Sequence, residues 1–504
     1  MTHSATELAA LVERFGSPRI MLVGDVMVDE YIYGDAERLS PEAPVPVVQE
    51  RYREQRAGGA GNVAAGLATL GAKVVVVSVC GDDFQGRLLT ELFQKMGGTG
   101  NGGGVGGVQT DGILRCADRP TTAKTRLIGL AQHRHPQQML RLDQEVTTPL
   151  SAEQQAQLLA YIKRELPSCA ALALEDYNKG LLSPEFCRAV ITIARELKKP
   201  ILVDPAFISD FSKYTGASTI TPNRYEAQRG SGLNLADTHE SAPLLAETLL
   251  KTLNLETCLL TLDKHGIYLL ERGKPGEHIA TRPRNVYDVT GAGDMVLATL
   301  AMAIASGADW SQAAALANIA GGLEVEKFGI VPLKREEIID ELYRQDHDSR
   351  GKIRSLADLL KDLDRHRRAG QKIVFTNGVF DILHAGHVQY LDFSRKQGDL
   401  LVVGINSDAS TSRLKGPARP VNPIADRMTV LAGLQSVDYV IAFDEDTPAN
   451  LIKAVLPDVL IKGDDYAGKE VVGRDVVEAR GGKVILAPFL QGRSTTNIIT
   501  KTKA

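Results

Sequence analysis

Residues 372–387 read KIVFTNGVFDILHAGH, and this stretch predicts more about fold and chemistry than any other part of the chain. Its start, Lys372–Thr376, predicts a buried strand, and Asn377 with Gly378 predicts the turn that ends it. His384 and His387 are at positions i and i+3, so both lie on one face of a helix that begins there. A strand, a turn and paired histidines at a helix start suit the binding of a nucleoside triphosphate and the stabilisation of charge on its phosphorus.

A metal site at these histidines is disfavoured. Zinc needs further ligands, and the last of the five cysteines is Cys258, far upstream of His384. A capping or core role for both histidines is the other alternative. That alternative leaves the polar residues that follow them in the sequence without an explanation.

Those later residues favour phosphate binding. Lys415, in the segment RLKG, can neutralise charge in a transition state, and Arg427 can hold a triphosphate. Ser494, Thr495 and Thr496 precede the last apolar run and predict a helix N-terminus directed at a phosphate. With them we assign four residues of the turn to the nucleotide site: Thr376, Asn377, Gly378 and Phe380.

Strands and helices alternate upstream of this stretch, which predicts α/β architecture with a doubly wound, mostly parallel sheet. The buried parallel strands are predicted at Ile20–Val23, Lys73–Val79, Ala171–Leu174 and Ile201–Val203. Residues 31–55 alternate without a helix between the two runs, so a small antiparallel sheet is expected to project there.

The length of 504 residues predicts more than one domain. We expect a first domain at 1–345, a linker and leading helix at 346–370, and a second domain at 371–504. Ser355 is expected to cap the leading helix. The glycine-dense tract 97–112 matches G-x-G-x-x-G at Gly102, Gly104 and Gly107, but no strand leads into it, so a flexible loop is predicted.

A second phosphate signature, DVTGAGD, occupies 288–294. Gly291 and Gly293 let backbone N–H groups at a helix N-terminus converge on an anion. Asp294 would then lie in the first turn, where a carboxylate suits the general base for a hydroxyl that attacks a γ-phosphate. The alternative is a glycine-rich turn whose aspartate only favours the helix dipole.

Further polar residues fall at the ends of other predicted strands. Asp25 follows the strand at Ile20–Gly24, where ligands bind in open α/β sheets. Gly58, Gly59 and Asn62 offer close backbone approach and an amide for sugar hydroxyls. Asn223 to Glu226 follow another strand and suit the orientation of Mg²⁺-bound phosphates.

Residues 1 to about 345 resemble the ribokinase-like (PfkB) carbohydrate kinases, on GGAGNVA at 58–64 and DVTGAGD at 288–294. The resemblance implies that Asp294 is the base, and that residues 31–55 form a lid, which often also makes a dimer contact. It implies three further groups of site residues: an anion hole at Gly291, Ala292 and Gly293; an ATP site at Asn223, Arg224, Tyr225, Glu226, Asp263 and Gly266, with Mg²⁺ carried by ATP near Glu226; and a sugar site at Asp25, Gly58, Gly59 and Asn62. The chain contains no G-x-x-x-x-G-K-[ST], so a P-loop kinase is excluded.

The second half resembles the HxGH nucleotidyltransferases of the cytidylyltransferase-like group, on TNGVFDILHAGH and the late STT. A Rossmann-like fold is implied. The family chemistry is attack by a phosphate oxygen on the α-phosphorus of a nucleotide, which releases pyrophosphate without a covalent intermediate.

The whole chain resembles the bifunctional enzymes that make ADP-heptose for lipopolysaccharide core, on segments such as LSPEAPVPVV at 39–48 and RPVNP at 419–423. The resemblance implies ATP-dependent phosphorylation of D-glycero-β-D-manno-heptose 7-phosphate at O1, and adenylyl transfer to heptose 1-phosphate, with Mg²⁺ and ATP at both sites. Another sugar, or CTP in the second site, stays open. Met295 and Glu175 depart from the family pattern.

Two rival functions fit less well. A flavin-cofactor fusion would have its transferase half first, and a sugar-sensing binding protein would not need Asp294, His384, His387 and Lys415 intact. The net charge of −4 gives no basic footprint for nucleic acid or membrane partners. The first residues lack a secretory signal, the longest apolar stretch (Met295–Ala305) is too short to span a bilayer, and no CxxC pair occurs. We therefore expect a cytoplasmic enzyme whose partners are sugar phosphates and ATP.

Overall fold

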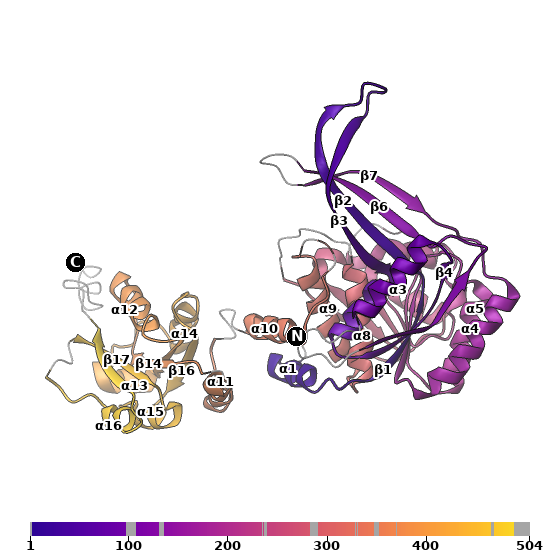
Figure 1. Ribbon diagram of the computed structural model, residues 1–504. Coiled ribbons are helices and arrows are strands. Elements are labelled where there is room, and N and C mark those ends of the chain that lie inside the picture. Colours follow the sequence, from indigo (N-terminus) through magenta and orange to yellow (C-terminus); the bar gives the residue numbers. More distant parts are fainter. Residues whose placement is uncertain are drawn as a thin grey trace. The chain divides into compact units, whose positions relative to one another are not determined.

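The computed structural model describes residues 3–96, 107–130, 136–233, 235, 239–282, 291–327, 329, 331–346, 352–368, 370–464 and 468–487. The chain divides into two compact units, Met1–Leu342 and Tyr343–Ala504 (Figure 1). The predicted domain boundaries at 345 and 371 stay a prediction. The boundary between the two compact units, after Leu342, lies close in sequence to the first of them.

A nine-stranded sheet forms the centre of the first unit. From one edge its strands are β13 (Glu277–Ile279), β12 (Ile267–Glu271), β11 (Thr257–Thr261), β10 (Thr219–Ile220), β9 (Ile201–Asp204), β8 (Ala171–Glu175), β1 (Arg19–Gly24), β4 (Lys73–Gly81) and β5 (Val108–Cys116). Neighbours from β11 to β5 are parallel, whereas β12 and β13 are antiparallel. The four strands predicted from apolar runs are therefore confirmed as β1, β4, β8 and β9.

Both faces of this sheet are buried, because apolar side chains lie on both faces of the central strands, as in Met21, Leu22 and Val23 of β1. Met21 and Val23 of β1 share a core with Leu158, Phe186 and Leu249 from helices on one face. The helices of this unit are α1 (Ala5–Glu13), α2 (Ala60–Thr69), α3 (Phe84–Met96), α4 (Ala152–Glu165), α5 (Pro184–Glu196), α6 (Arg224–Ser231), α7 (Ala242–Thr252), α8 (Ala292–Ala305), α9 (Trp310–Glu324) and α10 (Arg335–Asp346). Helices α4 and α5 lie on one side of the sheet and α8 and α9 on the other (Figure 1).

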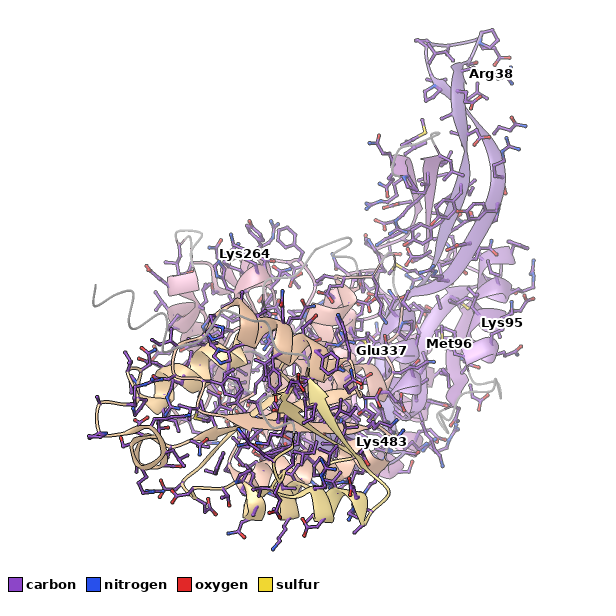
Figure 2. All side chains as sticks on the ribbon, turned by 90° about the vertical axis from the view of Figure 1, so that its left-hand side faces the viewer. Arg38, Lys95, Met96, Lys264, Glu337 and Lys483 are labelled. Atoms are coloured by element: carbon purple, nitrogen blue, oxygen red, sulfur yellow. The ribbon has the colours of Figure 1, made fainter. Side chains whose placement is uncertain are left out.

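A separate four-stranded sheet projects from the first unit, and we call it the lid (Figure 1). Its strands are, in order, β3 (Pro46–Gly59), β2 (Val26–Leu39), β6 (Ala123–Leu130) and β7 (Gln137–Gln144). Arg38 lies near the end farthest from the main sheet (Figure 2). The antiparallel pairing predicted at 31–55 is confirmed by β2 and β3. The sheet is larger than predicted, because β6 and β7 add to it and β2 pairs with β6 in parallel.

The second unit contains a five-stranded parallel sheet in the order β16-β15-β14-β17-β18. The strands are β14 (Ile373–Gly378), β15 (Leu400–Asn406), β16 (Tyr439–Phe443), β17 (Val459–Gly463) and β18 (Lys483–Ala487). The helices are α11 (Leu356–Arg368), α12 (Ala385–Arg395), α13 (Asp408–Lys415), α14 (Ile424–Ala432), α15 (Ala449–Val455) and α16 (Arg474–Glu478). Two apolar cores cover the sheet, one centred on Phe375 and one on Val374, because neighbouring residues of β14 face opposite sides.

Other local predictions have mixed outcomes. Ser355 accepts a hydrogen bond from the Asp358 N–H at 3.2 Å, which confirms the predicted cap of α11. The glycine-dense tract was predicted as a loop up to residue 112, but Val108–Gly112 belongs to β5. Its residues 97–106 lie outside the described residues. Within the described part of the chain, no helix is long and apolar enough to cross a membrane.

Candidate active sites

The first candidate site lies at the N-terminus of α8. Gly291 has φ of 90°, a left-handed value that turns the chain into the helix, and the Met295 N–H then bonds its carbonyl at 2.9 Å. Ala292, Gly293 and Asp294 therefore form the first turn, whose N–H groups have no partner within the helix. This is the anion-binding arrangement that the sequence predicted, although residues 283–290 lie outside the described residues.

The carboxylate of Asp294 is buried and held by two donors. The side-chain amide of Asn62, on α2, donates to one oxygen at 2.8 Å, and the hydroxyl of Tyr177 donates to the other at 2.9 Å. Burial raises the pKa of Asp294 to about 6, and the two hydrogen bonds oppose that shift. A carboxylate that is ionised at neutral pH but has a raised pKa suits a general base.

Two more carboxyl groups lie beside Asp294. Glu175 and Asp204 end the neighbouring strands β8 and β9 in direct register, and Asp204 Oδ2 lies 3.3 Å from where a Cβ on Gly293 would be. Burial, and then the nearby carboxylates, raise the pKa of both groups well above their usual range. Burial and the repulsion between these carboxylates therefore both favour the neutral form of each group. Glu175 Oε2 has no hydrogen-bond partner.

Asp25 lies at the carboxyl end of β1, as predicted. Its carboxylate accepts the backbone N–H groups of Tyr177 and Lys179, each at 3.0 Å. Burial, and then Asp176, raise the pKa of Asp25 to about 6. Neither Gly58 nor Gly59 has space for a Cβ atom. At Gly58 this atom would lie 1.9 Å from Asp29 Oδ2, and Gly59 in addition has a left-handed φ of 59°. The structure thus brings the predicted sugar residues to the same sheet edge as Asp294.

The predicted ATP residues follow β10 and β11. Asn223 caps α6 by accepting the Glu226 N–H at 2.9 Å, and the Glu226 carboxylate accepts the Asn223 N–H at 2.8 Å. Arg224 pairs with Asp263 at 3.2 Å, and the Tyr225 side chain is exposed. Gly266 has φ of 90° and lies against the backbone of residues 279–281. Asn223 and Glu226 therefore hold each other through two reciprocal hydrogen bonds.

Sequence reasoning missed two residues of this site. Tyr177 contacts Asp294 through its hydroxyl and Asp25 through its N–H, and it lies within EDYNKG, a segment that carried resemblance but no assigned role. Lys124 comes from β6 of the lid, and its ammonium lies 5.3 Å from the centre of the Tyr177 ring. Burial lowers the pKa of Lys124. No sequence signal connected β6 with this site.

The second candidate site lies where β14 meets α12. His384 is the N-cap of α12, and its ring stacks on His387 with 3.9 Å between ring centres. Phe380 meets His387 edge-on at 5.3 Å. Burial, and then His384, lower the pKa of His387 to about 4, so this ring is neutral at physiological pH. A Cβ on Gly386 would lie 3.0 Å from the His384 ring, which explains the small residue between the histidines.

The turn before the histidines is fixed by polar contacts across the sheet. Thr376 bonds the hydroxyl of Tyr390 at 2.6 Å and donates to the carbonyl of Ile461 at 3.1 Å. The ammonium of Lys462 donates to the side-chain oxygen of Asn377 at 2.5 Å. Three of the predicted nucleotide residues, Thr376, Asn377 and Phe380, therefore lie together with the histidines.

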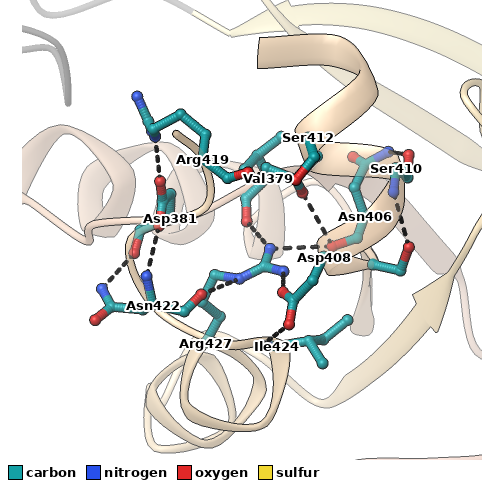
Figure 3. A network of polar contacts seen from close by, with 12 residues as sticks. Val379, Asp381, Asn406, Asp408, Ser410, Ser412, Arg419, Asn422, Ile424 and Arg427 are labelled. Carbon is teal, nitrogen blue, oxygen red and sulfur yellow. Dashed lines mark hydrogen bonds and ion pairs between the residues drawn. The ribbon is translucent and has the colours of Figure 1, made fainter. Parts of the chain in front are cut away.

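Arg427 contacts protein groups, whereas the sequence predicted that it holds a triphosphate. Its side chain is 1% exposed, and it donates to the carbonyls of Asn422 (3.0 Å), Val379 (2.6 Å) and Asn406 (3.0 Å) and to the Asp408 carboxylate (2.6 Å) (Figure 3). The guanidinium therefore connects the turn before the histidines with the end of β15 and the start of α13. Its contacts give no support to the predicted role in triphosphate binding.

Asp381 strengthens the same network (Figure 3). Its buried carboxylate pairs with Arg419 and accepts the N–H groups of Val421 (2.7 Å) and Asn422 (3.0 Å). These hydrogen bonds and Arg419 lower the pKa of Asp381 against the opposing effect of burial. The segment after α13 is thereby attached to the histidine turn, and sequence reasoning did not single out this aspartate.

Lys415 is not joined to the histidines by a described contact. Lys415 is exposed at the end of α13. Within the described residues, no hydrogen bond or ion pair connects Lys415 with His384 or His387. Ser494, Thr495 and Thr496 lie outside the described residues.

Comparison with known proteins identifies both units. Residues 17–335 match the pfkB family of carbohydrate kinases, and residues 375–501 match the cytidylyltransferase-like family. Among solved structures, ribokinase of Arabidopsis thaliana complexed with ribose and ATP has a TM-score of 0.50 at 19% identity, and covers 65% of this chain and 99% of its own. Phosphofructokinase-2 of Escherichia coli in complex with potassium has a TM-score of 0.52 at 15% identity, covering 65% and 100%. These two structures show the fold of the first unit.

The fold and the matched families make the chain a bifunctional enzyme, with a sugar kinase in the first unit and a nucleotidyltransferase in the second. It is 44% identical to the bifunctional protein HldE of Geobacter metallireducens, over 95% of each chain. It is also 44% identical to the protein of that name from Wolinella succinogenes, over 96% of this chain and 98% of the relative. The chain belongs to the HldE family. The predicted pairing of a heptose kinase with an adenylyltransferase is thereby confirmed.

The contact between Tyr177 and Asp294 predicts a shift in the pH profile of the kinase. Because the base must be deprotonated, wild-type activity should be lost as the pH falls through about 6. Tyr177→Phe removes a hydrogen bond that favours the ionised carboxylate, so the acid limb of kcat/KM should move up by roughly one pH unit. Tyr52→Phe, on the lid, is the matched control and should leave the limb in place. An unchanged limb in Tyr177→Phe would show that this hydroxyl does not tune the base.

The buried position of Arg427 predicts a loss of stability in Arg427→Met. Three carbonyls lose their donors, so the free energy of unfolding of the second unit should fall by about 2–3 kcal/mol. Arg413→Met is the control, since Arg413 pairs with Asp446 on the surface and should contribute under about 1 kcal/mol. Calorimetry of the full chain measures both. If Arg427→Met melts like wild type but binds ATP weakly, Arg427 holds the triphosphate after all.

Proposed function

We propose that the first unit phosphorylates D-glycero-β-D-manno-heptose 7-phosphate at O1 with ATP, and that the second joins heptose 1-phosphate to AMP from ATP, giving ADP-heptose and pyrophosphate. The observation that carries the proposal is the presence, in one chain of this family, of two separate phosphate-directed sites, one at the start of α8 and one at the start of α12.

In the kinase reaction, Asp294 accepts the proton of the O1 hydroxyl as that oxygen attacks the γ-phosphorus of ATP, and the bond from this phosphorus to the bridging oxygen breaks to release ADP. Asn62 and Tyr177 hold the carboxylate in place. The N–H groups at the start of α8 stabilise the charge that develops on the phosphoryl oxygens. Asp25 and Asn62 lie at the same edge and orient the sugar hydroxyls. Holding both substrates in line supplies much of the rate.

Magnesium fits this site as a companion of ATP. Within the described residues, no group of three or more histidine, cysteine or acidic side chains could hold a metal by itself. The carboxylate oxygens of Glu226 and the unpartnered Oε2 of Glu175 are donors that suit Mg²⁺. Mg²⁺ held by such oxygens would neutralise charge on the phosphoryl groups. We propose Mg²⁺ with ATP for the second unit as well.

In the transferase reaction, a phosphate oxygen of heptose 1-phosphate attacks the α-phosphorus of ATP, and pyrophosphate leaves. His387 is neutral, because its pKa is lowered to about 4, and it donates a hydrogen bond to the phosphate without a buried charge. His384 lies against it at the start of α12, where free N–H groups also face the ligand. Lys415 and the residues 494–496 are proposed to hold the rest of the triphosphate.

We also propose a homodimer through the lid and a cytoplasmic location. Large apolar side chains of the lid are exposed, among them Leu39, Val45, Leu140 and Leu142. Such a surface is typical of a protein–protein contact. The described cysteines are all free and buried, which fits a reducing compartment.

Single substitutions should separate the two activities. Asp294→Asn removes the base and should lower heptose phosphorylation by roughly 10²–10⁴-fold while adenylyl transfer to heptose 1-phosphate persists. His387→Ala should lower adenylyl transfer by roughly 10²-fold or more and spare the kinase. Both rates are measured on the full chain, with products identified by mass spectrometry.

Asp82→Asn is the matched control for the kinase substitution, because Asp82 is exposed and should have no effect on either rate. Parallel loss of both activities in a folded Asp294→Asn or His387→Ala protein would contradict the two-site account.

A further inference from the structure

Lys124 is the only lysine in the four strands of the lid. It lies on β6, in register with Asp29 of β2 and with Asp143 of β7. Residues in register project from the same face of a sheet. The Lys124 ammonium lies 5.3 Å from the centre of the Tyr177 ring, which follows β8 at the carboxyl edge of the main sheet. This face of the lid is therefore turned toward the kinase site.

The same face of the lid borders both the base and the predicted sugar residues. Asp29 is buried, and one of its carboxylate oxygens lies against Gly58. The hydroxyl of Tyr177 donates to Asp294 at 2.9 Å. Burial raises the pKa of Asp294, and the charge of Lys124 is among the effects that oppose this shift. Lys124 is thus a cation of the lid that acts at the position where phosphoryl transfer is proposed.

The arginines of the lid have a different role, because they are paired within it. Ion pairs join lid arginines to lid carboxylates in five places: Arg51 with Asp35, Arg53 with Glu30 and Glu50, Arg56 with Glu54, Arg126 with Asp29, and Arg141 with Asp143. These pairs connect neighbouring strands or neighbouring residues of one strand. They hold the lid together and leave its single lysine as the exception.

The charge of Lys124 is supported only from beyond ion-pair distance. Burial lowers the pKa of Lys124, and Asp29 and Asp143 oppose that shift. Both carboxylates are already in contact with an arginine, Asp29 with Arg126 at 2.6 Å and Asp143 with Arg141 at 2.9 Å. With the residues that the structure describes, the Lys124 ammonium makes no ion pair or hydrogen bond of its own.

An ammonium in this position suits a phosphate group. Lysine binds phosphate as a compact point charge with three N–H donors. The attraction to the Tyr177 ring is electrostatic and leaves these donors available to a ligand. An anion beside the ammonium would also oppose the effect of burial on the pKa of Lys124.

We propose that Lys124 is a substrate-binding residue of the kinase, whose ammonium the lid holds against a phosphate group of the bound substrates. The inference rests on the proposed phosphorylation of a sugar phosphate by ATP. The phosphate is either the γ-phosphoryl group of ATP or the phosphate that the sugar already carries. In both cases the lid adds a cation to the N–H groups at the start of α8.

The test is Lys124→Gln in the full chain, with heptose 7-phosphate and ATP as substrates. Kinase kcat/KM should fall roughly 10²-fold, while adenylyl transfer to heptose 1-phosphate and the melting temperature stay unchanged. Lys124→Arg keeps the charge and should retain more kinase activity than Lys124→Gln. Lys73→Gln is the matched control, because Lys73 is exposed at the start of β4, at the opposite edge of the main sheet.

Separate kinetic constants identify which phosphate is bound. Contact with the sugar's own phosphate predicts a raised KM for heptose 7-phosphate and an unchanged rate with the unphosphorylated heptose. Contact with the γ-phosphoryl group predicts a lower kcat with both sugars and an unchanged KM for heptose 7-phosphate.

The pH dependence separates phosphate binding from an effect on the base. Because the pKa of Asp294 is about 6, a variant in which only this pKa has risen would regain wild-type activity at a pH well above that value. Such a recovery in Lys124→Gln, or wild-type kinetics at every pH, would overturn the inference. If Lys124→Gln does not fold, Lys124→Met replaces it under the same criteria. A wild-type protein that does not phosphorylate heptose 7-phosphate would instead refute the proposed function, so the two failures are distinguishable.

Discussion

The buried carboxylate of Asp294 is the constraint on which the kinase unit depends. A carboxylate removed from water must be compensated, and here the compensation comes from three segments that are distant in sequence: the start of α8, Asn62 on α2 and Tyr177 after β8. The parallel sheet brings all three to its carboxyl edge. The result is a base that is ionised at neutral pH, with a pKa of about 6, and surrounded by N–H donors.

The site of the second unit contains a positively charged group where the kinase site has a carboxylate. Its parallel sheet also directs polar groups to the carboxyl edge, but the groups there are two stacked histidines, of which His387 is neutral, and the ammonium of Lys462. Arg427 and Asp381 lie behind them and fix the loops that carry the site. Both of these charges are paired within the protein, Arg427 with Asp408 and Asp381 with Arg419.

Sequence predicted the parts of each site that depend on local geometry. The glycines of TGAGD and the spacing of HAGH place Asp294, His384 and His387 at helix starts because only nearby residues are involved. Tyr177 was missed because its contacts with Asp294 and Asp25 arise from strand order, which one sequence does not reveal. An arginine can donate to a phosphate or to backbone carbonyls, and the sequence does not distinguish these roles. Only the burial of Arg427 in the structure shows that its donors are used by carbonyls. The pairing of β2 with β6 in the lid was missed because β6 lies far from β2 in the chain.

The two reactions do not follow each other directly. The kinase product is a bisphosphate, and the transferase acceptor is a 1-phosphate, so a separate phosphatase must remove the 7-phosphate between them. The most direct test supplies purified wild-type protein with heptose 7-phosphate and ATP, with and without a phosphatase specific for the 7-phosphate, and identifies products by mass spectrometry. We predict heptose 1,7-bisphosphate alone without the phosphatase, and ADP-heptose only when it is added. ADP-heptose without a phosphatase, or no bisphosphate at all, would contradict the account.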